Sequence, residues 1–502
     1  MKRRSFIRTA AAAAAALSLP RRYAMAATPT FSRRLPNVDA ITGDGRTVTL
    51  TDAMLKDLRA ALRGRVLLAG EAGYDDARRI LSPSFDKRPA LIVQPSGSAD
   101  VRTAVNFARD NGGLLLAVKC GGHSFSGQST TDRGMQIDLS SFRDVRVDPV
   151  ARRALVTGGS LLGAVDHEAT AHGLVTPLGT VSHTGVGGLT TGGGFGRLAR
   201  KFGLAIDNLE SVQVVTADGQ LQRASANENP DLFWGVRGGG GNFGIVTSFE
   251  FRLHPMRRQV IGGEIVFPIA RAKDVLTMMG DYALRAPDEL SLGFVMAQPP
   301  GNAPGITAIE VCYCGEERLF EQAMAPIRRL GQPMADTVKT MDYTAIQKSG
   351  DVTDPRAQGI YLKSGFIPAL GTDLIDAMLK GFPANPGRAT AIFFQMSGGA
   401  ISRVPAASTA FPARDIFANL LTASQWPFGS VDPAPHMAAI REYWATLERF
   451  TRGFYVNDLE PTHTADAVRN NYRANATRLV AVKNKYDPKN LFRLNANILP
   501  TV

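Results

Sequence analysis

Three glycine-rich clusters in the first half of the chain most constrain what this sequence can fold into. They read GGHSFSGQS from residue 121, GTVSHTGVGGLTTGGGFG from residue 179 and RGGGGNFGIVTSFEF from residue 237. Glycine at this density lets the backbone approach a ligand closely, and successive N–H groups in turns form concave sites for anions. Turn formation alone does not explain three such clusters. They therefore predict a fold built around a phosphate-bearing cofactor.

A nicotinamide dinucleotide is a weak alternative for that cofactor. Gly194, Gly196 and Ala199 satisfy the G-x-G-x-x-A fingerprint, and the strand-like SVQVVTAD ends in Asp218 further along the chain. The fingerprint requires a β-strand directly before its first glycine. The preceding GVGGLTTGG is a poor strand, so the match fails where the binding mechanism needs it.

Other site chemistries have little support in the sequence. His167 and His172 are five residues apart, which does not form the H-E-x-x-H zinc motif, and no G-x-S-x-G elbow occurs, so no metal site and no serine triad are expected. Cys312 and Cys314 share one face of an alternating strand but lie too far along it for an easy disulfide. Cys120 is expected to be a buried thiol at a strand end.

The first 26 residues, MKRRSFIRTAAAAAAALSLPRRYAMA, have the pattern of an export signal. A basic start precedes an alanine-dominated run that is too short to span a bilayer, and Ala24-Met25-Ala26 forms a small-x-small cleavage site. Paired Arg3 and Arg4 resemble the twin-arginine signal of bacteria, whose export machinery carries folded proteins. We therefore expect a periplasmic or secreted protein with no stable membrane anchor.

Length and composition favour a globular protein with two lobes. At 502 residues the chain exceeds what one hydrophobic core usually supports, and 44% hydrophobic with 20% charged residues argue against a disordered chain. The signal holds six basic and no acidic residues, so its removal would lower the formal charge from +12 to +6. A charge of that size favours solubility and gives no footprint for nucleic acid.

Two patterns along the chain predict an α+β protein. Between residues 37 and 255, short strands and helices alternate, including the strand RPALIVQP, the helix SADVRTAVNFARDNGG and the hairpin SVQVVTADGQLQRAS. Between residues 256 and 455, longer alternating strands such as LSLGFVMAQ indicate an antiparallel sheet backed by helices. In the C-terminal segment, residues 456–502, the stretch TADAVRNNYRANATRLVAVKNKYDP predicts one long amphipathic helix.

Six motifs follow one another along the chain: Arg88-Pro89 with LIVQP, the helix after Asp100-Val101, GGHSFSGQS, TGVGGLTTGGGFG, DLFWGVRGGGGNFGIVTSFEF and KYDPKNLFRLNANILP. Together and in this order they resemble the FAD-linked oxidases of the berberine-bridge-enzyme type, within the vanillyl-alcohol-oxidase/PCMH superfamily. The resemblance covers nearly the whole mature chain. It implies a PCMH-type FAD-binding domain of residues 37–255, a substrate-binding domain of residues 256–455, and a C-terminal segment, 456–502, that returns to the FAD lobe.

The resemblance also implies a covalent bond between His123 and the flavin. In the family, the histidine of the GGHS motif bonds to the 8α methyl carbon, and a neutral imidazole on a glycine-flanked loop is a competent nucleophile for that step. Many relatives attach the flavin a second time through a cysteine, but Val181 stands at that position here. We expect FAD with a single covalent link, and a structural or pyrophosphate-adjacent role for His183.

The same motifs place further residues around the cofactor. Asn495 and Asn497 match the tail that lies against the isoalloxazine in the family, where their amides could hydrogen-bond flavin or substrate. The FAD-binding residues implied by the resemblance are His123, Gly121, Gly122, Ser124, Gly127, Gln128, Gly179, Thr180, Thr184, Gly185, Gly188, Gly193, Gly194, Val246, Asn495 and Asn497.

The catalytic base is expected in GFYVNDLEP, from residue 453, which resembles the family's Y-x-N-aromatic segment. Tyr455 and Asn457 match this pattern, whereas Asp458 replaces the usual aromatic residue. Tyr455 is the first candidate for the base, Asp458 the second, and Gln395 on the strand FFQMSGGA is a possible orienting group. A packing role for Tyr455 is equally consistent with the sequence.

These features together predict an exported FAD-dependent oxidase. Such an enzyme removes a hydride from a C–H bond of an alcohol, sugar or amine while a base takes the proton, and then passes the electrons to oxygen. A dehydrogenase that uses another electron acceptor is one alternative, and a non-catalytic flavin-binding or ligand-binding protein is another. The small-molecule substrate stays open, because sequence gives the side chains of the substrate lobe but not the shape of its pocket.

Overall fold

The computed structural model describes residues 35–301, 303–351, 358–382, 387–429, 432–459 and 463–502. The predicted export signal lies outside the described residues and stays a prediction. Residues 37–502 form a unit of their own. None of the helices in the described ranges is long and apolar enough to cross a membrane.

A four-stranded mixed sheet lies in the N-terminal part of this unit. Its strands are, in spatial order, β3 (Arg65–Leu67), β4 (Leu91–Gln94), β6 (Met135–Asp138) and β5 (Leu116–Lys119). Both β4 and β5 run parallel to β6. Parallel strands need a crossover connection, and α4 (Ser98–Asp110) supplies it, with Ala104, Val105 and Ala108 fully buried as the sequence pattern predicts.

A five-stranded antiparallel sheet follows in the chain. Its order is β11 (Leu221–Ser225), β10 (Leu209–Val215), β12 (Ile245–Arg252), β8 (Arg153–Thr157) and β7 (Val145–Asp148). The predicted hairpin is confirmed as β10 paired with β11. Its turn contains Gly219 at a φ of +77°, a left-handed conformation that glycine adopts without strain.

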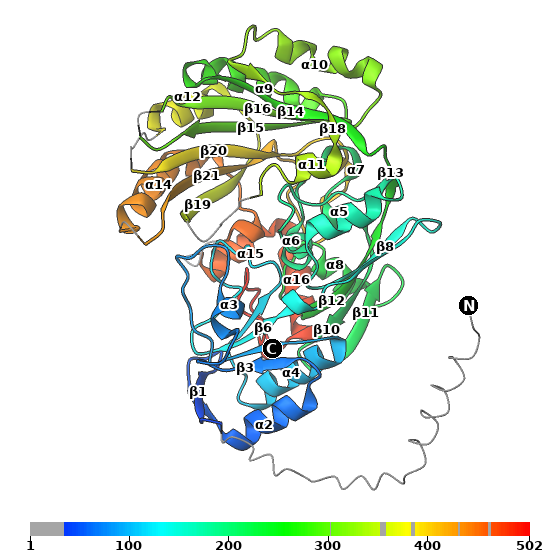
Figure 1. The fold of residues 1–502 in the computed structure, drawn as a ribbon, viewed down its shortest axis with the longest axis vertical. Coiled ribbons are helices and arrows are strands. Elements are labelled where there is room, and N and C mark those ends of the chain that lie inside the picture. The colour runs from blue at the N-terminus through cyan, green and yellow to red at the C-terminus, as the bar shows by residue number, and fades with distance from the viewer. Residues whose placement is uncertain (1–34, 302, 352–357, 383–386, 430–431, 460–462) are drawn as a thin grey trace, which may run out of the picture. The chain divides into compact units, whose positions relative to one another are not determined.

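An eight-stranded antiparallel sheet dominates the second half of the chain (Figure 1). Along the sheet the strands are β17 (Ala335–Asp336), β14 (Gln259–Pro268), β16 (Ile306–Tyr313), β15 (Leu290–Gln298), β20 (Ala389–Met396), β21 (Ala418–Pro427) and β19 (Gln358–Ile367), with β18 (Lys339–Asp342) also paired to β14. The helices α9 (Ala272–Tyr282), α10 (Phe320–Arg328), α12 (Thr372–Gly381) and α14 (Ala434–Leu447) pack on one face. The predicted helix-backed antiparallel sheet and the α+β fold class are both confirmed.

The two faces of this sheet have different roles, because successive side chains of a strand point to opposite sides. On β20, Ile392 and Phe394 are buried in the core against the helices. The residues between and after them, Phe393 and Gln395, line a cavity on the other side. The open face of the sheet therefore forms one wall of a site.

The C-terminal segment differs from the single long helix that its pattern predicts. It consists of α15 (Ala465–Asn471), a 3₁₀ turn at residues 473–475 and α16 (Ala476–Tyr486). The break has a physical cause, since the side chain of Asn471 accepts a hydrogen bond from the Phe454 N–H and that of Asn475 donates to the Ala406 and Thr409 carbonyls. These tertiary hydrogen bonds compete with continuous helix.

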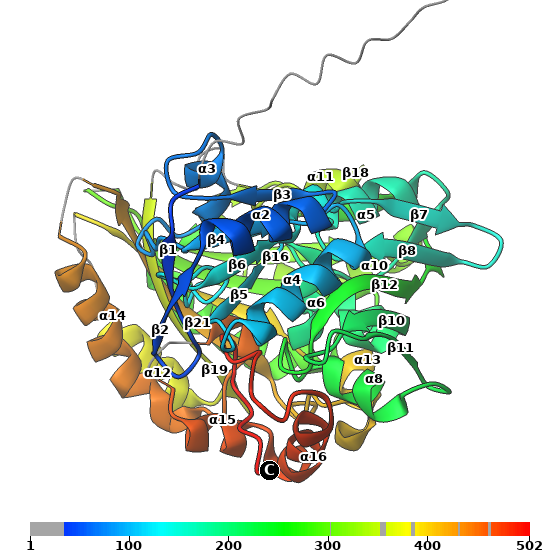
Figure 2. The ribbon, with the colours of Figure 1, turned by 90° about the horizontal axis from the view of Figure 1, so that it is seen from below.

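After α16 the chain returns to the glycine-rich half. Figure 2 shows α16 beside α8 (Pro230–Val236), and the two helices are in contact. Lys483 is fully buried and donates to the Asp487 carboxylate and to the Asn242 and Phe492 carbonyls. Asn242 in turn holds the tail through Ala496 and Ile498. The tail is thereby fixed beside the third glycine cluster.

Candidate cofactor and active site

A cavity of about 460 Å³ lies where the glycine clusters, the C-terminal tail and the eight-stranded sheet meet. The three glycine clusters and the tail supply one side of it. The sheet supplies the facing wall, through Leu362 of β19, Phe393 and Gln395 of β20 and Leu421 of β21. The segment that contains Tyr455 and Asp458 completes the lining.

The structure brings most of the predicted site residues to this one cavity. The three catalytic candidates Tyr455, Asp458 and Gln395 all line it. So do the predicted cofactor residues His123, Gly121, Gly122, Ser124, Gln128, Gly179, Thr180, Thr184, Gly185, Gly188, Val246 and Asn495.

Four predicted cofactor residues do not line the cavity: Gly127, Gly193, Gly194 and Asn497. The three glycines have positive φ angles and serve the packing of the backbone. A Cβ atom on Gly194 would lie 2.4 Å from that of Ala205, and one on Gly127 would lie 2.5 Å from the Phe85 ring. These glycines shape the loops that carry the site.

Other glycines leave space that a ligand can fill. A Cβ atom on Gly188 or Gly240 would meet no heavy atom within 4 Å, and one on Gly241 would meet only the Asn495 side chain, at 3.9 Å. The Asn495 Oδ1 and Ser129 Oγ atoms are buried at the same cavity without a hydrogen-bond partner among the described residues. Buried polar atoms normally have partners. Exposed backbone and unpaired polar atoms together fit a large polar cofactor such as FAD.

His123 stands on the loop after β5, held by close backbone contact. A Cβ atom on Gly121 would lie 2.3 Å from the Gly185 nitrogen, so the first two glycine clusters touch here. The Nε2 atom of His123 is 2.7 Å from Nδ1 of His183, and its Nδ1 is 3.4 Å from the Thr184 hydroxyl. Burial, together with the neighbouring His183, lowers the pKa of His123 to about 4. The imidazole is therefore neutral near pH 7, the form in which it is a nucleophile.

The loop that carries His183 is held from the other half of the chain. Asp351 follows α11 (Tyr343–Gln347) and accepts hydrogen bonds from the backbone N–H and the hydroxyl of Ser182. The Asp351 Oδ1 atom is also 4.0 Å from Nε2 of His183. Val181 of the same loop lines the cavity with an unreactive side chain.

Cys120 is a neighbour of His123 at the cavity wall. A Cβ atom on Gly185 would lie 2.5 Å from its sulfur, which itself lies 3.7 Å from the Ser160 carbonyl oxygen. Burial raises the pKa of the Cys120 thiol to about 11. Cys312 and Cys314 are likewise free thiols.

The hydroxyl of Tyr455 is already engaged as an acceptor. The Gly194 N–H and the Asn457 side-chain amide each donate to it, both at 2.8 Å. The ring packs edge-on against Phe195, and burial raises the pKa of the phenol above its ordinary value. The phenol therefore keeps its proton at neutral pH.

Asp458 is a buried carboxyl group with a raised pKa. Only 6% of its surface is exposed, and burial raises its pKa to about 6, partly offset by the hydrogen bond from Asn419. The Asn419 Nδ2 atom donates to Asp458 Oδ2 at 2.8 Å and to Gln395 Oε1 at 2.9 Å. A carboxyl group with a pKa near the working pH suits general acid–base chemistry.

Sequence reasoning missed Asn419, Gly240 and Gly241. Asn419 lies on β21, which the pattern ANLLTASQWP does not identify as a strand, because nearly all of its residues are buried and it shows no alternation. A signal did exist for the two glycines, since both belong to the third cluster, where only Val246 was assigned.

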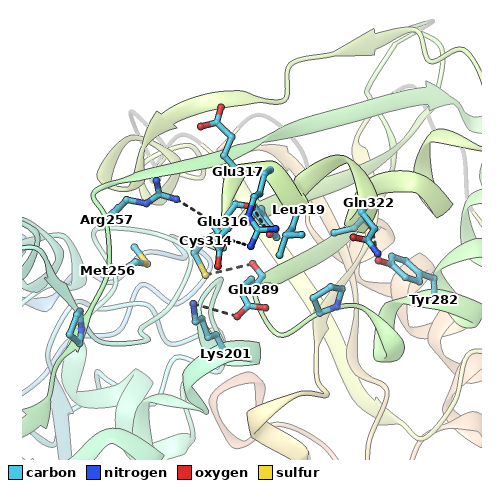
Figure 3. A pocket seen from close by; sticks show the side chains of 16 residues that line it. Lys201, Met256, Arg257, Tyr282, Glu289, Cys314, Glu316, Glu317, Leu319 and Gln322 are labelled. Carbon is cyan, nitrogen blue, oxygen red and sulfur yellow. Dashed lines mark hydrogen bonds and ion pairs between the residues drawn. The ribbon is translucent and has the colours of Figure 1, made fainter.

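A second and larger cavity, of about 900 Å³, shares no lining residue with the first. Figure 3 shows its charged side chains, with Lys201 facing Glu289 at 3.6 Å and Arg257 donating to the Gly315 carbonyl. Both acidic and basic side chains line it, and none of the predicted site residues is among its lining residues. The predicted catalytic residues and most of the predicted cofactor residues line the smaller cavity around His123 instead.

Comparison with known proteins shows the family to which this chain belongs. The model of an FAD binding domain matches residues 89–225, and that of a berberine and berberine-like domain matches residues 454–499. An FAD-linked oxidoreductase of Dictyostelium discoideum is 33% identical over 82% of this chain and 89% of its own length. This chain belongs to the berberine-bridge-enzyme family of FAD-linked oxidoreductases.

Two further relatives extend the comparison. The (R)-6-hydroxynicotine oxidase of Paenarthrobacter nicotinovorans is 30% identical over 88% of this chain and 97% of its own. The solved structure of a xylooligosaccharide oxidase from Myceliophthora thermophila, in complex with xylobiose, has a TM-score of 0.79 at 26% identity and covers 90% of this chain and 99% of that one. The predictions of an FAD-dependent oxidoreductase and of FAD as cofactor are confirmed.

Proposed function

We propose that this family member is an oxidase that carries FAD on a single covalent link to His123 and oxidises a C–H bond next to oxygen or nitrogen, with Asp458 as the base. One observation carries the proposal: a neutral imidazole and a carboxyl group with a pKa of about 6 line the same cavity. Val181 offers no second point of attachment.

Asp458 accepts the substrate proton in this proposal. FAD, when bound, takes up the hydride from the substrate carbon. At neutral pH the Asp458 carboxyl is largely ionised, and the hydrogen bond from Asn419 holds one of its oxygens while the other can meet the hydroxyl or amine of the substrate. Gln395, held by the same Asn419 amide, orients the substrate.

Tyr455, the first candidate from the sequence, takes a positioning role instead. Its oxygen already accepts two hydrogen bonds. A phenol that keeps its own proton has no further lone pair with which to accept the substrate proton. By binding the Gly194 N–H it fixes the end of the second glycine cluster. The geometry therefore favours Asp458 over Tyr455 as the base.

The facing wall supports a substrate with an apolar skeleton. Leu362, Phe393 and Leu421 are apolar, whereas Gln395 and Asp458 are polar. The other two polar side chains of this part of the lining, Tyr455 and Asn457, already hydrogen-bond to each other. Burying the many hydroxyls of a sugar against such a wall would leave them without partners, which costs about 1–3 kcal/mol each. We therefore favour an alcohol or amine over a sugar, although one relative is a xylooligosaccharide oxidase.

Oxygen as acceptor and export by the twin-arginine route complete the proposal. The relatives named oxidases support oxygen, and the pattern of residues 1–26 supports export to the periplasm or medium. Peroxide formed on turnover would distinguish an oxidase from a dehydrogenase. Anaerobic addition of alcohols, amines and sugars, with bleaching of the flavin as readout, tests the substrate class and would expose a non-catalytic flavoprotein.

The covalent link has a direct test. Protein precipitated with acid should stay yellow, whereas a His123→Ala variant should release its flavin into the supernatant. His172→Ala, which changes an exposed histidine, is the matched control and should stay yellow. A colourless wild-type precipitate would refute the covalent link.

A further inference from the structure

Three side chains form a row that leads away from the proposed attachment point. His123 Nε2 faces His183 Nδ1 at 2.7 Å, and the opposite nitrogen of His183, Nε2, lies 4.0 Å from Asp351 Oδ1. Substrate oxidation, as proposed above, uses neither His183 nor Asp351. The row joins the first two glycine clusters to the segment after α11.

The carboxylate at one end of the row favours one arrangement of the ring protons. Asp351 Oδ1, at 4.0 Å, lies beyond hydrogen-bonding distance of His183 Nε2, but a carboxylate this close favours the ring N–H of His183 on that nitrogen. His183 Nδ1 is then an acceptor, and the close contact requires the proton of the His123 ring to lie on Nε2. The lone pair of His123 is left on Nδ1, beside the Thr184 hydroxyl.

Bond formation at Nδ1 creates a charge that this site disfavours. When a neutral imidazole that keeps its Nε2 proton gains a bond to carbon at Nδ1, the ring becomes cationic. Burial opposes a positive charge on the His123 ring, as its pKa of about 4 indicates. The ring therefore needs an acceptor for the Nε2 proton, and His183 Nδ1 lies within hydrogen-bonding distance of it.

We propose that His183 accepts the Nε2 proton of His123 while FAD becomes attached to Nδ1, and that Asp351 is the positioning residue that holds His183 in the accepting tautomer. This inference rests on the proposed covalent link to His123. It assigns a role in cofactor attachment to two residues that substrate oxidation does not require.

The reaction balances with dioxygen as the final oxidant. One bond forms, between His123 Nδ1 and the 8α methyl carbon, while one C–H bond of that methyl group and the Nε2–H bond of His123 break. The two electrons of the C–H bond remain on the flavin, which is reduced, and its ring system and His183 take the two protons. Dioxygen then removes two electrons and two protons as hydrogen peroxide, which restores the oxidised flavin and neutral His183.

The test measures covalent attachment separately from activity. His183→Asn keeps an acceptor near the position of Nδ1 but cannot take up a proton at neutral pH. Purified variants are incubated in air with excess FAD, and intact mass and the colour of the acid precipitate are followed with time. General bases contribute about 10²–10⁴-fold, so attachment should slow at least about 100-fold, while non-covalent FAD binding stays close to that of wild type.

Two further variants keep the test decisive if His183→Asn folds poorly. Asp351→Asn should also slow attachment, by a smaller factor. His183→Ala should attach FAD slowly, and its attachment rate should recover when imidazole is added to the buffer. A purely structural defect would not be rescued in this way. His172→Ala is the control and should attach FAD at the wild-type rate.

The outcomes separate this inference from the proposed function. Wild-type protein that holds FAD only non-covalently would refute the covalent link and this inference together. Covalent wild type with attachment at an unchanged rate in His183→Asn or Asp351→Asn would overturn the inference and leave the link to His123 standing. A flavin methylene found on Nε2 of His123, by NMR of the flavin peptide, would overturn it as well.

Discussion

Replacing Asp458 by asparagine should remove activity and stabilise the protein at the same time. The two side chains have nearly the same shape, and an asparagine oxygen can still accept the hydrogen bond from Asn419. The variant therefore deletes the charge of a buried carboxyl group with little change in packing.

The magnitude follows from the raised pKa. Burial raises the pKa of Asp458 from 3.8 to about 6. Each of these roughly two pKa units corresponds to about 1.4 kcal/mol. Between these two pH values the folded state keeps a proton that the unfolded state has released, so this group's contribution to stability falls as pH rises. At pH 7.5 the ionised carboxyl should destabilise the fold by about 3 kcal/mol, and at pH 5 by about half of that.

The assay compares wild type and Asp458→Asn in urea unfolding at pH 7.5 and pH 5. The variant should be more stable at both values, and its advantage should shrink at the lower pH. In steady-state kinetics the variant should lose about 10²–10⁴-fold in kcat/KM, the range for a general base. Wild-type kcat/KM should fall below about pH 6, where the base is protonated.

Asp376→Asn is the matched control, because its carboxylate is exposed and pairs with Lys273 at the surface. It should change neither stability nor kcat/KM by a measurable amount. The reasoning fails if Asp458→Asn keeps kcat/KM within about tenfold of wild type and still loses activity below about pH 6 as wild type does. It also fails if the variant gains no stability at pH 7.5.

Three other substitutions test separate parts of the structure. Tyr455→Phe should lower the free energy of unfolding, measured by heat or urea, by about 2 kcal/mol, because two buried hydrogen bonds are lost. Its kcat/KM should still fall below about pH 6, and loss of that fall would make the tyrosine the base. Gly188→Ala, in a His123→Ala background, should weaken FAD binding in a titration without lowering stability, because the added methyl group enters the cavity rather than the protein. Arg414→Ala should destabilise the fold by about 3–5 kcal/mol, since it leaves the buried Asp207 carboxylate unpaired, and a second change of Asp207 to leucine should recover part of that loss.

Local patterns in the sequence predict the elements that depend on local physics. The alternation in LSLGFVMAQ gives β15 with one face buried, and the period of α4 places its buried face correctly. The glycine clusters predict the cavity because their freedom of backbone conformation is a property of each residue. Gly240 and Gly241 show the limit of this reasoning, since only their surroundings reveal that they face open space.

What the sequence does not predict depends on contacts between distant residues. Asn419 reaches Asp458 only because β21 lies in the middle of the sheet, and His183 meets His123 only because Gly121 and Gly185 allow two loops to touch. The break in the C-terminal helix has the same origin, because the partners of Asn475 lie more than 60 residues earlier. Helix propensity alone carries no information on such partners.

The raised pKa of Cys120 affects how readily its thiol is oxidised. An oxidase of the proposed kind releases hydrogen peroxide a short distance from this sulfur, and peroxide attacks thiolates rather than thiols. With its pKa raised to about 11, fewer than about one in a thousand of these side chains would be ionised at pH 7. In such an oxidase, the raised pKa of the Cys120 thiol would protect this side chain from oxidation by the enzyme's own product.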